Sequence, residues 1–495
     1  MMKHLLFFIR HILGAIEEIP LRWGFIIVIA EVIVALRIFL EITMSTVFHD
    51  VISLPVTVIF FNTWFLSLFF FLVICLSIAS RIPLIKVAKV LICGLPIILI
   101  PPIGLMLGVS DKFTFLVGTW KEILYDAVTF TMFHEHFGFF FAIEIIIFLL
   151  GAFFFLISHT SWSRSILGVF AAYGTLIFFG TQPVFFEKIF ANNFFGFSHD
   201  QQFALLNTIL LLVSFIFIFL YKQAGLMRSM FFRFRSGRIL FFLALCVAMI
   251  MGALESDHFY LFNFIIGLLL FCLFVAHTLL VNDMADIAID RISNPLRPYS
   301  SGILKKNDMY FLNAATLIGL GVLLFIIGSI PLYIITMMNI AASTLYSPFR
   351  FRKNPFSFLL PALGWSTAVF YGFFAQNPFP TSIPFSVLVL YMSLFLLFCF
   401  FIPIKDMKDI VGDTKEGVKN YMTIFGYREG RAVTAASASL SFPAFSFMIG
   451  NSLLFMLSII FSACTLFFVM RYERFGERPL FFLLLFFLLT AIFVV

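Results

Sequence analysis

Two short acidic segments contain the residues of this sequence best suited to chemistry. The first, VNDMADIAID, contains Asn282, Asp283, Asp286 and Asp290, and the second, IKDMKDIVGD, contains Asp406, Asp409 and Asp413. In each segment three aspartates stand at positions i, i+3 and i+7, which a helix of 3.6 residues per turn places on one face. The spacing therefore predicts two helices that each present a row of carboxylates.

Carboxylates this close together repel one another, and at a membrane boundary the cost of removing them from water is added to the repulsion. A cation must compensate, and oxygen ligands alone favour a hard ion such as Mg²⁺. Because Mg²⁺ usually combines a few carboxylates with substrate phosphate oxygens, two facing rows would hold a diphosphate between them. The alternative is two solvated helix ends balanced by nearby Lys and Arg, but two segments of matching spacing make this alternative less favourable.

The rest of the chain is apolar enough to require a lipid environment. Of its 495 residues, 62% are hydrophobic and 12% are charged, and no water-soluble core could bury that much apolar surface. Apolar runs of about 17–25 residues recur, which is the length that crosses the hydrocarbon core as a helix. We therefore expect an all-α polytopic membrane protein.

The apolar runs form two groups on either side of a basic stretch. We expect a first domain, 1–225, of unknown function with about six transmembrane helices, near 23–44, 56–79, 85–108, 138–157, 166–182 and 203–221. The stretch YKQAGLMRSMFFRFRSGR is the best candidate linker. We expect a second domain, 226–495, with nine helices, near 238–254, 258–281, 308–329, 331–346, 356–374, 383–404, 434–449, 452–470 and 478–495.

Basic residues alternate between the loops of the second domain. The loops after its second, fourth, sixth and eighth spans carry four, three, six and three Lys or Arg residues, whereas the loops between them carry none. The positive-inside rule then places the basic loops, with both acidic segments, on the cytoplasmic side. This topology and contact with anionic lipid explain the net charge of +7, so nucleic-acid binding is not expected.

At the acidic segments the sequence resembles the UbiA superfamily of intramembrane prenyltransferases. The family's first motif, NDxxDxxxD followed by RPxxSG, is matched by NDMADIAID and RPYSSG, and its second, KDxxDxxGDxxxG, is matched from Lys405 to Gly417. The resemblance covers about residues 235–495. It implies a nine-helix bundle whose central cavity opens to the cytoplasm and to lipid.

The resemblance also implies an enzyme, a prenyltransferase that moves a polyprenyl group from a prenyl diphosphate to a lipophilic acceptor. A quinone precursor, a tetrapyrrole and a glycerol-based lipid are possible acceptors. Motif position implies that Mg²⁺ ions bind Asn282, Asp283, Asp286 and Asp290 in the first segment and Asp406, Asp409 and Asp413 in the second. Of these, we expect the catalytic residues to be Asp286, Asp290, Asp409 and Asp413. The sequence predicts no particular protein partner.

Four further residues are expected to bind the diphosphate, and one to lie near the acceptor. The segment TLYSPFRFRK resembles the family's tyrosine-then-basic loop, which implies that Tyr346 and Arg350 contact the diphosphate. Arg297 and Lys405 are expected to help, because cationic groups neutralise phosphate charge. Arg238 is expected near the acceptor pocket, although the proline that follows it in the family is missing here.

Asn420 also departs from the family, in which many members have threonine at this position.

Three other functions stay open. A polyprenyl-phosphate phosphoribosyltransferase would belong to the same superfamily, but in that branch the segment before the Arg-Pro pair is longer than Asp290 to Arg297 is here. An intramembrane terpene cyclase would ionise the same donors at the same metal site. A transporter or lipid-binding scaffold would use the carboxylates as an ion path, but such residues usually lie within a span and not at its end.

Overall fold

The computed structural model describes residues 2–44, 54–106, 125, 139–190, 198–222, 236–293, 299–347 and 351–494. The described residues form helices and no strands. Eleven helical segments among them are long and apolar enough to cross a membrane, which confirms the all-α polytopic fold. The chain divides into two compact units: unit 1 is Met1–Asn192 with Phe197–Lys222, and unit 2 is Asn193–Gly196 with Gln223–Val495. The domain boundary at residues 225–226 stays a prediction.

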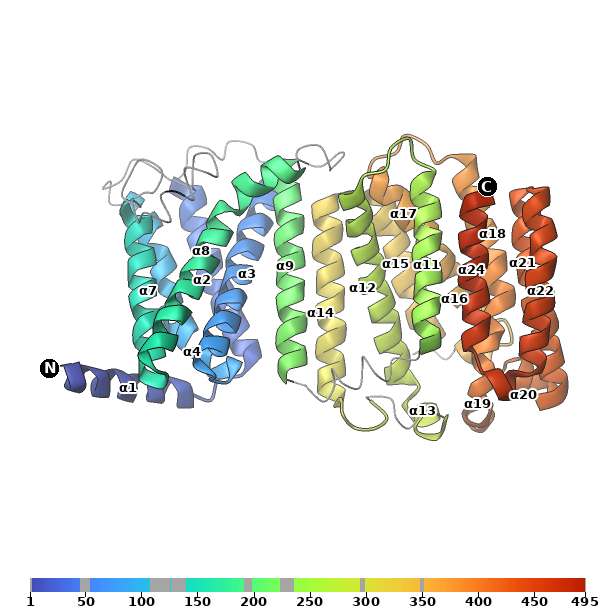
Figure 1. Ribbon diagram of the computed structural model, residues 1–495, viewed down its shortest axis with the longest axis horizontal. Coiled ribbons are helices and arrows are strands. Elements are labelled where there is room, and N and C mark those ends of the chain that lie inside the picture. The colour runs from blue at the N-terminus through green and yellow to red at the C-terminus, as the bar shows by residue number, and fades with distance from the viewer. Residues whose placement is uncertain are drawn as a thin grey trace. The chain divides into compact units, whose positions relative to one another are not determined.

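Unit 1 consists of a bundle of apolar helices with one amphipathic helix, α1 (Met2–Glu18), lying across its end (Figure 1). The bundle contains α2 (Trp23–Met44), α3 (Leu54–Ser80), α4 (Leu84–Gly94), η1 (Leu95–Leu99), α5 (Ile100–Met106), α7 (Phe139–His159), α8 (Trp162–Phe190) and α9 (His199–Lys222). Six of the segments that could cross a membrane lie here, at the places that the apolar runs predicted.

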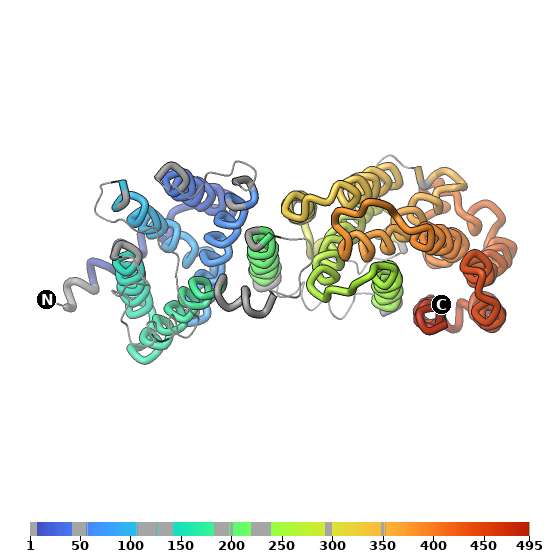
Figure 2. Tube along the Cα trace, turned by 90° about the horizontal axis from the view of Figure 1, so that it is seen from above, coloured from blue at the N-terminus to red at the C-terminus, as the bar shows by residue number. Residues whose placement is uncertain are grey.

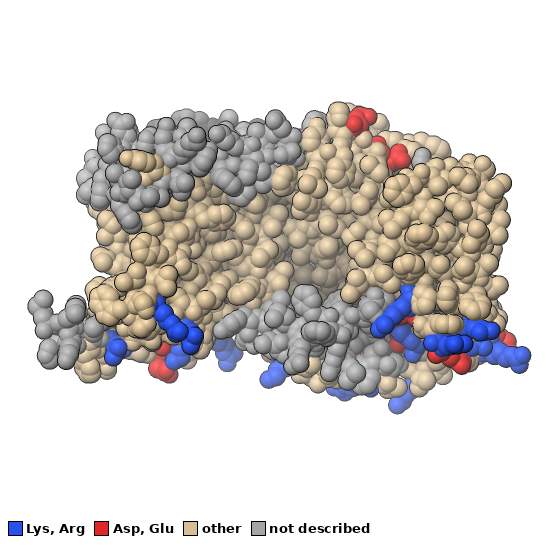
Figure 3. Space-filling model, in the orientation of Figure 1, with Lys and Arg blue, Asp and Glu red and all other residues tan. Residues whose placement is uncertain are grey.

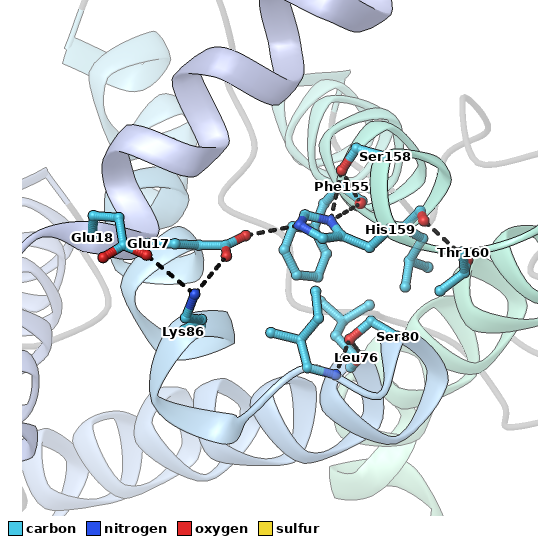
Figure 4. Close-up of polar contacts among 11 residues, drawn as sticks. Glu17, Glu18, Leu76, Ser80, Lys86, Phe155, Ser158, His159 and Thr160 are labelled. Carbon is cyan, nitrogen blue, oxygen red and sulfur yellow. Dashed lines mark hydrogen bonds and ion pairs between the residues drawn. The ribbon is translucent and has the colours of Figure 1, made fainter.

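Charged groups attach α1 to the end of this bundle (Figure 4). The Lys86 ammonium of α4 lies 3.4 Å from one carboxylate oxygen of Glu17 and 3.3 Å from one of Glu18. Lys89 donates a hydrogen bond to the Glu17 carbonyl oxygen at 2.7 Å. The imidazole of His159, at the end of α7, lies 2.9 Å from the Glu17 carboxylate. Glu17 therefore joins three helices.

A second ionic group is buried inside the bundle of unit 1. The Arg37 guanidinium of α2 donates to the Glu41 carboxylate at 2.6 Å, one helical turn along the same helix, and to Glu144 of α7 at 3.2 Å. Arg37 also donates to the carbonyl oxygen of Ile98 in η1. Buried charges need such partners, because removing either partner leaves an uncompensated charge in an apolar environment.

Unit 2 is a second bundle, with short helices gathered at one end (Figure 1). Its longer helices are α11 (Ser236–Leu254), α12 (Leu261–Ala285), α14 (Lys306–Ile327), α15 (Ile330–Tyr346), α18 (Phe385–Phe401), α21 (Tyr427–Ile449), α22 (Ser452–Met470) and α24 (Arg478–Val494). The short elements are α13 (Ile287–Ser293), η2 (Phe351–Lys353), η3 (Ile402–Lys408), α19 (Ile410–Glu416), α20 (Tyr421–Phe425) and α23 (Tyr472–Phe475).

The fifth span predicted for this region, near 356–374, is interrupted. It consists of α16 (Leu359–Ser366) and α17 (Ala368–Gln376), separated at Thr367. The other eight predicted spans each overlap one continuous helix of the described residues. The number of helices in unit 2 that cross a membrane stays a prediction.

The helices of unit 2 contact one another in a closed circuit, and Figure 2 views them end-on. Along the circuit, α11 is followed by α12, α15, α16, α18, α21, α22 and α24, and α24 packs against α11 again. Lys and Arg side chains of this unit gather at the end that carries α13 and α19, while acidic side chains are visible at the opposite end (Figure 3). The alternation of Lys and Arg between the loops predicted this separation of basic and acidic side chains. Which end faces the cytoplasm stays a prediction.

A close approach of α11 and α17 fixes one side of the circuit. A Cβ atom added at Gly252 of α11 would lie 2.1 Å from the carbonyl oxygen of Val369, and one added at Gly372 of α17 would lie 2.0 Å from that of Met249. Each helix thus has a glycine where the backbone of the other approaches, as is common between membrane helices. The contact holds α17 against α11, and α16 directly precedes α17 in the chain.

Replacing Gly372 by alanine should destabilise unit 2, because the new methyl group would overlap a backbone carbonyl that no side-chain rotation can move away. We expect a loss of about 1–3 kcal/mol, the usual cost of overpacking, seen as a lower unfolding temperature in detergent. The matched control is Gly321→Ala in α14, where nothing lies within 4 Å of the added Cβ. Equal unfolding temperatures for the two variants would contradict the close approach.

Candidate active site

The two acidic segments line the same cavity at one end of unit 2. The helix α13, which ends the first segment, packs against α19, which ends the second. The cavity is lined by Asn282, Asp286 and Asp290 from the first segment and by Asp406, Asp409 and Asp413 from the second. Asp283, the remaining residue expected to hold metal, is half-buried and is not among the lining residues.

The backbone is broken at the middle aspartate of each segment. Asp286 separates α12 from α13 with φ −97° and ψ 11°, and Asp409 separates η3 from α19 with φ −100° and ψ 6°. This conformation is sparsely populated, and many active-site residues adopt it. Helical bonding resumes beyond each break, where Asp290 N–H donates to Asp286 O at 2.8 Å and Asp413 N–H donates to Asp409 O at 2.9 Å.

The prediction of one continuous helix under each carboxylate row is therefore wrong. Each row is divided between two helical pieces that meet at the middle aspartate. The i, i+3, i+7 spacing of the aspartates fits a helix of 3.6 residues per turn. It does not reveal whether the backbone hydrogen bonds continue through the segment.

An asparagine amide contacts one aspartate of each segment. Asn282 Nδ2 donates to Asp286 Oδ2 at 2.8 Å, and Asn420 Nδ2 donates to Asp413 Oδ2 at 2.8 Å. Asn420 also caps α20, because its Oδ1 accepts from the Thr423 N–H at 3.0 Å. Both bonds orient a carboxylate without neutralising its charge. Sequence reasoning noted Asn420 only as a departure from the family and missed this contact.

A lysine and a tyrosine lie beside the carboxylates. Lys405 Nζ donates to the Tyr346 hydroxyl at 3.4 Å and lies over the rings of Tyr346 and Trp365, 5.1 Å and 5.6 Å from their centroids. Both Lys405 and Tyr346 line the cavity. Lys408 lines it too and forms an ion pair with Glu477, which directly precedes α24. That pair was not predicted, because no local pattern relates residues so far apart in the sequence.

The other basic residues predicted for the site cannot be placed in the same way. Arg297 and Arg350 lie outside the described residues, and so does the side chain of Arg238. The backbone of Arg238 lies in the first turn of α11, and Phe241 and Phe242, which follow it in that helix, line the cavity.

Inward from its charged mouth, the cavity is mainly apolar. The space among its lining residues is about 1570 Å³, which includes open solvent at the mouth. Besides Tyr346, six aromatic side chains from five helices contribute to its lining: Phe241, Phe242, Phe274, Trp365, Phe401 and Phe481. Sequence reasoning could not select them, because the chain contains 75 phenylalanines and those that line the cavity have no distinguishing local pattern.

The donor atoms at the mouth suit a hard divalent cation, but only with further ligands. The residues of the two acidic segments that line the cavity were all expected to hold metal. Each of them offers an oxygen atom, the ligand atom that such cations prefer. In the described part of the chain, however, no group of three or more carboxylate, imidazole or thiol side chains is placed to hold an ion by itself. A cation held here would need further ligands, such as water or substrate oxygen atoms.

Comparison with known proteins places the chain in a family. The sequence model of the UbiA prenyltransferase family matches residues 240–491. Digeranylgeranylglyceryl phosphate synthase of Saccharolobus solfataricus is 26% identical over 223 residues, 43% of this chain and 75% of that protein. The chloroplastic 2-acylphloroglucinol 4-prenyltransferase of Humulus lupulus is 29% identical over 180 residues, 34% of this chain and 42% of that protein. The apo structure of a UbiA homolog from Aeropyrum pernix K1 covers 51% of this chain and 96% of its own, with 20% identity and a TM-score of 0.42.

The helices and the family match together define an integral membrane prenyltransferase. The chain belongs to the UbiA prenyltransferase family. The matched region lies within unit 2, so unit 1 is outside it.

Replacing Asn420 by aspartate should destabilise the metal-free protein. Aspartate still caps a helix N-terminus, but it removes the amide donor and places a second carboxylate against Asp413. We expect a loss of about 1.5–3 kcal/mol, typical of a hydrogen bond to a charged group, measured as a lower unfolding temperature at neutral pH.

The control for this substitution is Asn451→Asp. Asn451 also caps a helix, α22, but its Nδ2 donates to the carbonyl oxygen of Val494 and not to a carboxylate. We expect it to lose only a neutral hydrogen bond, about 1 kcal/mol. If Asn420→Asp were no less stable than this control, the contact with Asp413 would not orient the carboxylate as described.

Proposed function

We propose that unit 2 transfers a polyprenyl group from a prenyl diphosphate to a lipophilic acceptor, with Mg²⁺ as its divalent cation and with the active site facing the cytoplasm. The observation that best supports this proposal is the meeting of both acidic segments at the mouth of one apolar cavity. A prenyl diphosphate has a highly charged end and a hydrocarbon end. The charged mouth and the apolar interior match these two parts.

The proposed metal ligands are the lining residues of the two segments, Asn282, Asp286, Asp290, Asp406, Asp409 and Asp413. Among these we assign catalysis to Asp286, Asp290, Asp409 and Asp413. Mg²⁺ suits a site that provides few protein ligands, because it commonly keeps waters and binds substrate phosphates as well. When bound, the cation neutralises charge on the departing diphosphate. Asp283 does not line the cavity, and we leave it out of this set.

Lys405 and Tyr346 are proposed to bind the diphosphate, because they lie beside the carboxylates and offer an ammonium and a hydroxyl group. Arg297 and Arg350 are assigned the same role, and Arg238 the acceptor pocket, from their sequence positions alone.

In the reaction, the bond between the allylic carbon and the diphosphate oxygen breaks, and its electron pair leaves on the diphosphate. A carbon or oxygen atom of the acceptor forms the new bond and gives up a proton. The aromatic lining keeps water from competing with the acceptor.

Incubating the purified protein with labelled prenyl diphosphates, Mg²⁺ and a native lipid extract tests the proposal, with products identified by mass. Glycerol-based lipids and phenolic acceptors belong in the panel, because the relatives are named for a glyceryl phosphate lipid and for an acylphloroglucinol. A prenylated acceptor is the expected product. A cyclic hydrocarbon formed without acceptor would instead identify a terpene cyclase, and no diphosphate release with any donor would contradict both.

Replacing Asp286 or Asp413 by asparagine should abolish most prenyl transfer. Each change removes a negative charge from the cation site, and the loss of several kcal/mol of charge stabilisation corresponds to roughly 10²–10⁴-fold in rate. The matched control is Asp308→Asn at the start of α14, where the carboxylate accepts from the Lys305 N–H and does not line the cavity. Wild-type turnover in both cavity variants would exclude the carboxylates from the reaction.

A further inference from the structure

The cavity has a defined inner end where three helices meet. On α12 the lining residues run inward from Asp286 at the mouth to Phe274, and on α15 they run from Tyr346 to Asn339. Gly364 lines the cavity near the inner end of α16. A Cβ atom added at Gly364 would lie 3.7 Å from Asn339 Oδ1 and 3.7 Å from the Phe274 ring. The innermost lining residues of α12 and α15 thus converge on the same glycine.

The structure behind this inner end is closely packed. Asn339 Nδ2 donates to the Thr367 hydroxyl at 2.8 Å, and that hydroxyl donates to the Gly364 carbonyl oxygen at 2.5 Å. Phe274 stacks on the ring of Tyr371, with centroids 6.3 Å apart. Asn339, Phe274 and Tyr371 are at most 4% exposed. The junction between α16 and α17 therefore closes the cavity with bonded and buried groups.

We propose that Phe274, Asn339 and Gly364 form a floor that limits the length of the donor's prenyl chain. This inference rests on the proposed function. With the diphosphate at the mouth, a prenyl chain that stays inside the cavity extends along the apolar interior toward the floor. A chain that is too long must bend or leave the cavity, and a chain that is too short leaves apolar surface uncovered.

The depth of the cavity sets the expected length. Twelve residues separate Asp286 from Phe274, and at 1.5 Å per residue they correspond to about 18 Å along α12. An isoprene unit adds four carbon–carbon bonds to the chain, about 5 Å when extended. The cavity therefore favours donors of about three to four isoprene units over shorter and longer ones.

Gly364→Ala adds a methyl group at the floor and makes the cavity shallower. It carries little risk to the fold, because its Cβ would lie at ordinary contact distance from its neighbours. Phe274→Leu makes the cavity deeper, because the leucine side chain is smaller than the aromatic ring that it replaces. The assay supplies an equimolar mixture of prenyl diphosphates with two to six isoprene units to each purified protein, with Mg²⁺ and the acceptor used by the wild type. Gly321→Ala is the control, since it adds the same methyl group outside the cavity.

We expect Gly364→Ala to shift the ratio of three-unit to four-unit products about tenfold toward the shorter donor, because one methylene in an apolar pocket changes discrimination by at least that much. Phe274→Leu should shift the ratio toward longer donors, and the control should match the wild type. An unchanged product ratio in both floor variants would contradict the proposed floor. An equal loss of prenyl transfer with every donor would contradict it as well. A wild type that transfers none of the donors would instead overturn the proposed function.

If the acceptor occupied the inner end, Gly364→Ala would raise the acceptor KM and leave the ratio of donor lengths unchanged. That outcome would also contradict the proposal that the floor limits donor chain length.

Discussion

Repulsion among carboxylates gathered at one apolar cavity is the constraint on which unit 2 depends. Asp286, Asp290, Asp409 and Asp413 face the same space, and charges removed from water are costly unless they are paired or bonded. The amide of Asn420 bonds to Asp413, but an amide adds no positive charge. The asparagine amides thus orient Asp286 and Asp413 and leave the negative charge of both carboxylates in place.

The rest of the bundle keeps the two acidic segments together. The glycine contact of α11 with α17 brings the α16–α17 junction against the cavity, and the Lys408–Glu477 pair connects the second segment to the start of α24. These contacts involve residues far from any motif. They explain why a site of few polar residues requires a large apolar frame, since a bilayer offers little hydrophobic force between helices and precise packing must replace it.

Much of this arrangement could be predicted from the sequence, because a membrane restricts the choices. Spanning helices must be long and apolar, so the runs near 258–281 and 452–470 could be recognised in the sequence, and the two aspartate motifs marked the cavity mouth. The breaks at Asp286 and Asp409 were not visible, since spacing alone does not report backbone hydrogen bonding. Tertiary pairs such as Lys408 with Glu477 require the fold itself.

In the proposed reaction, the two ends of the cavity contact different parts of the prenyl diphosphate. At the mouth, Lys405 and the aspartates interact with charge, which is the same for every prenyl diphosphate, so they cannot distinguish one chain length from another. At the inner end, Phe274, Asn339 and Gly364 provide shape and little charge. Because about 18 Å of helix separates the two groups, a substitution at the floor can change which donor fits without moving the carboxylates. Under these proposals, the chemistry and the chain-length selection depend on different residues, and a substitution can change one while the other is kept.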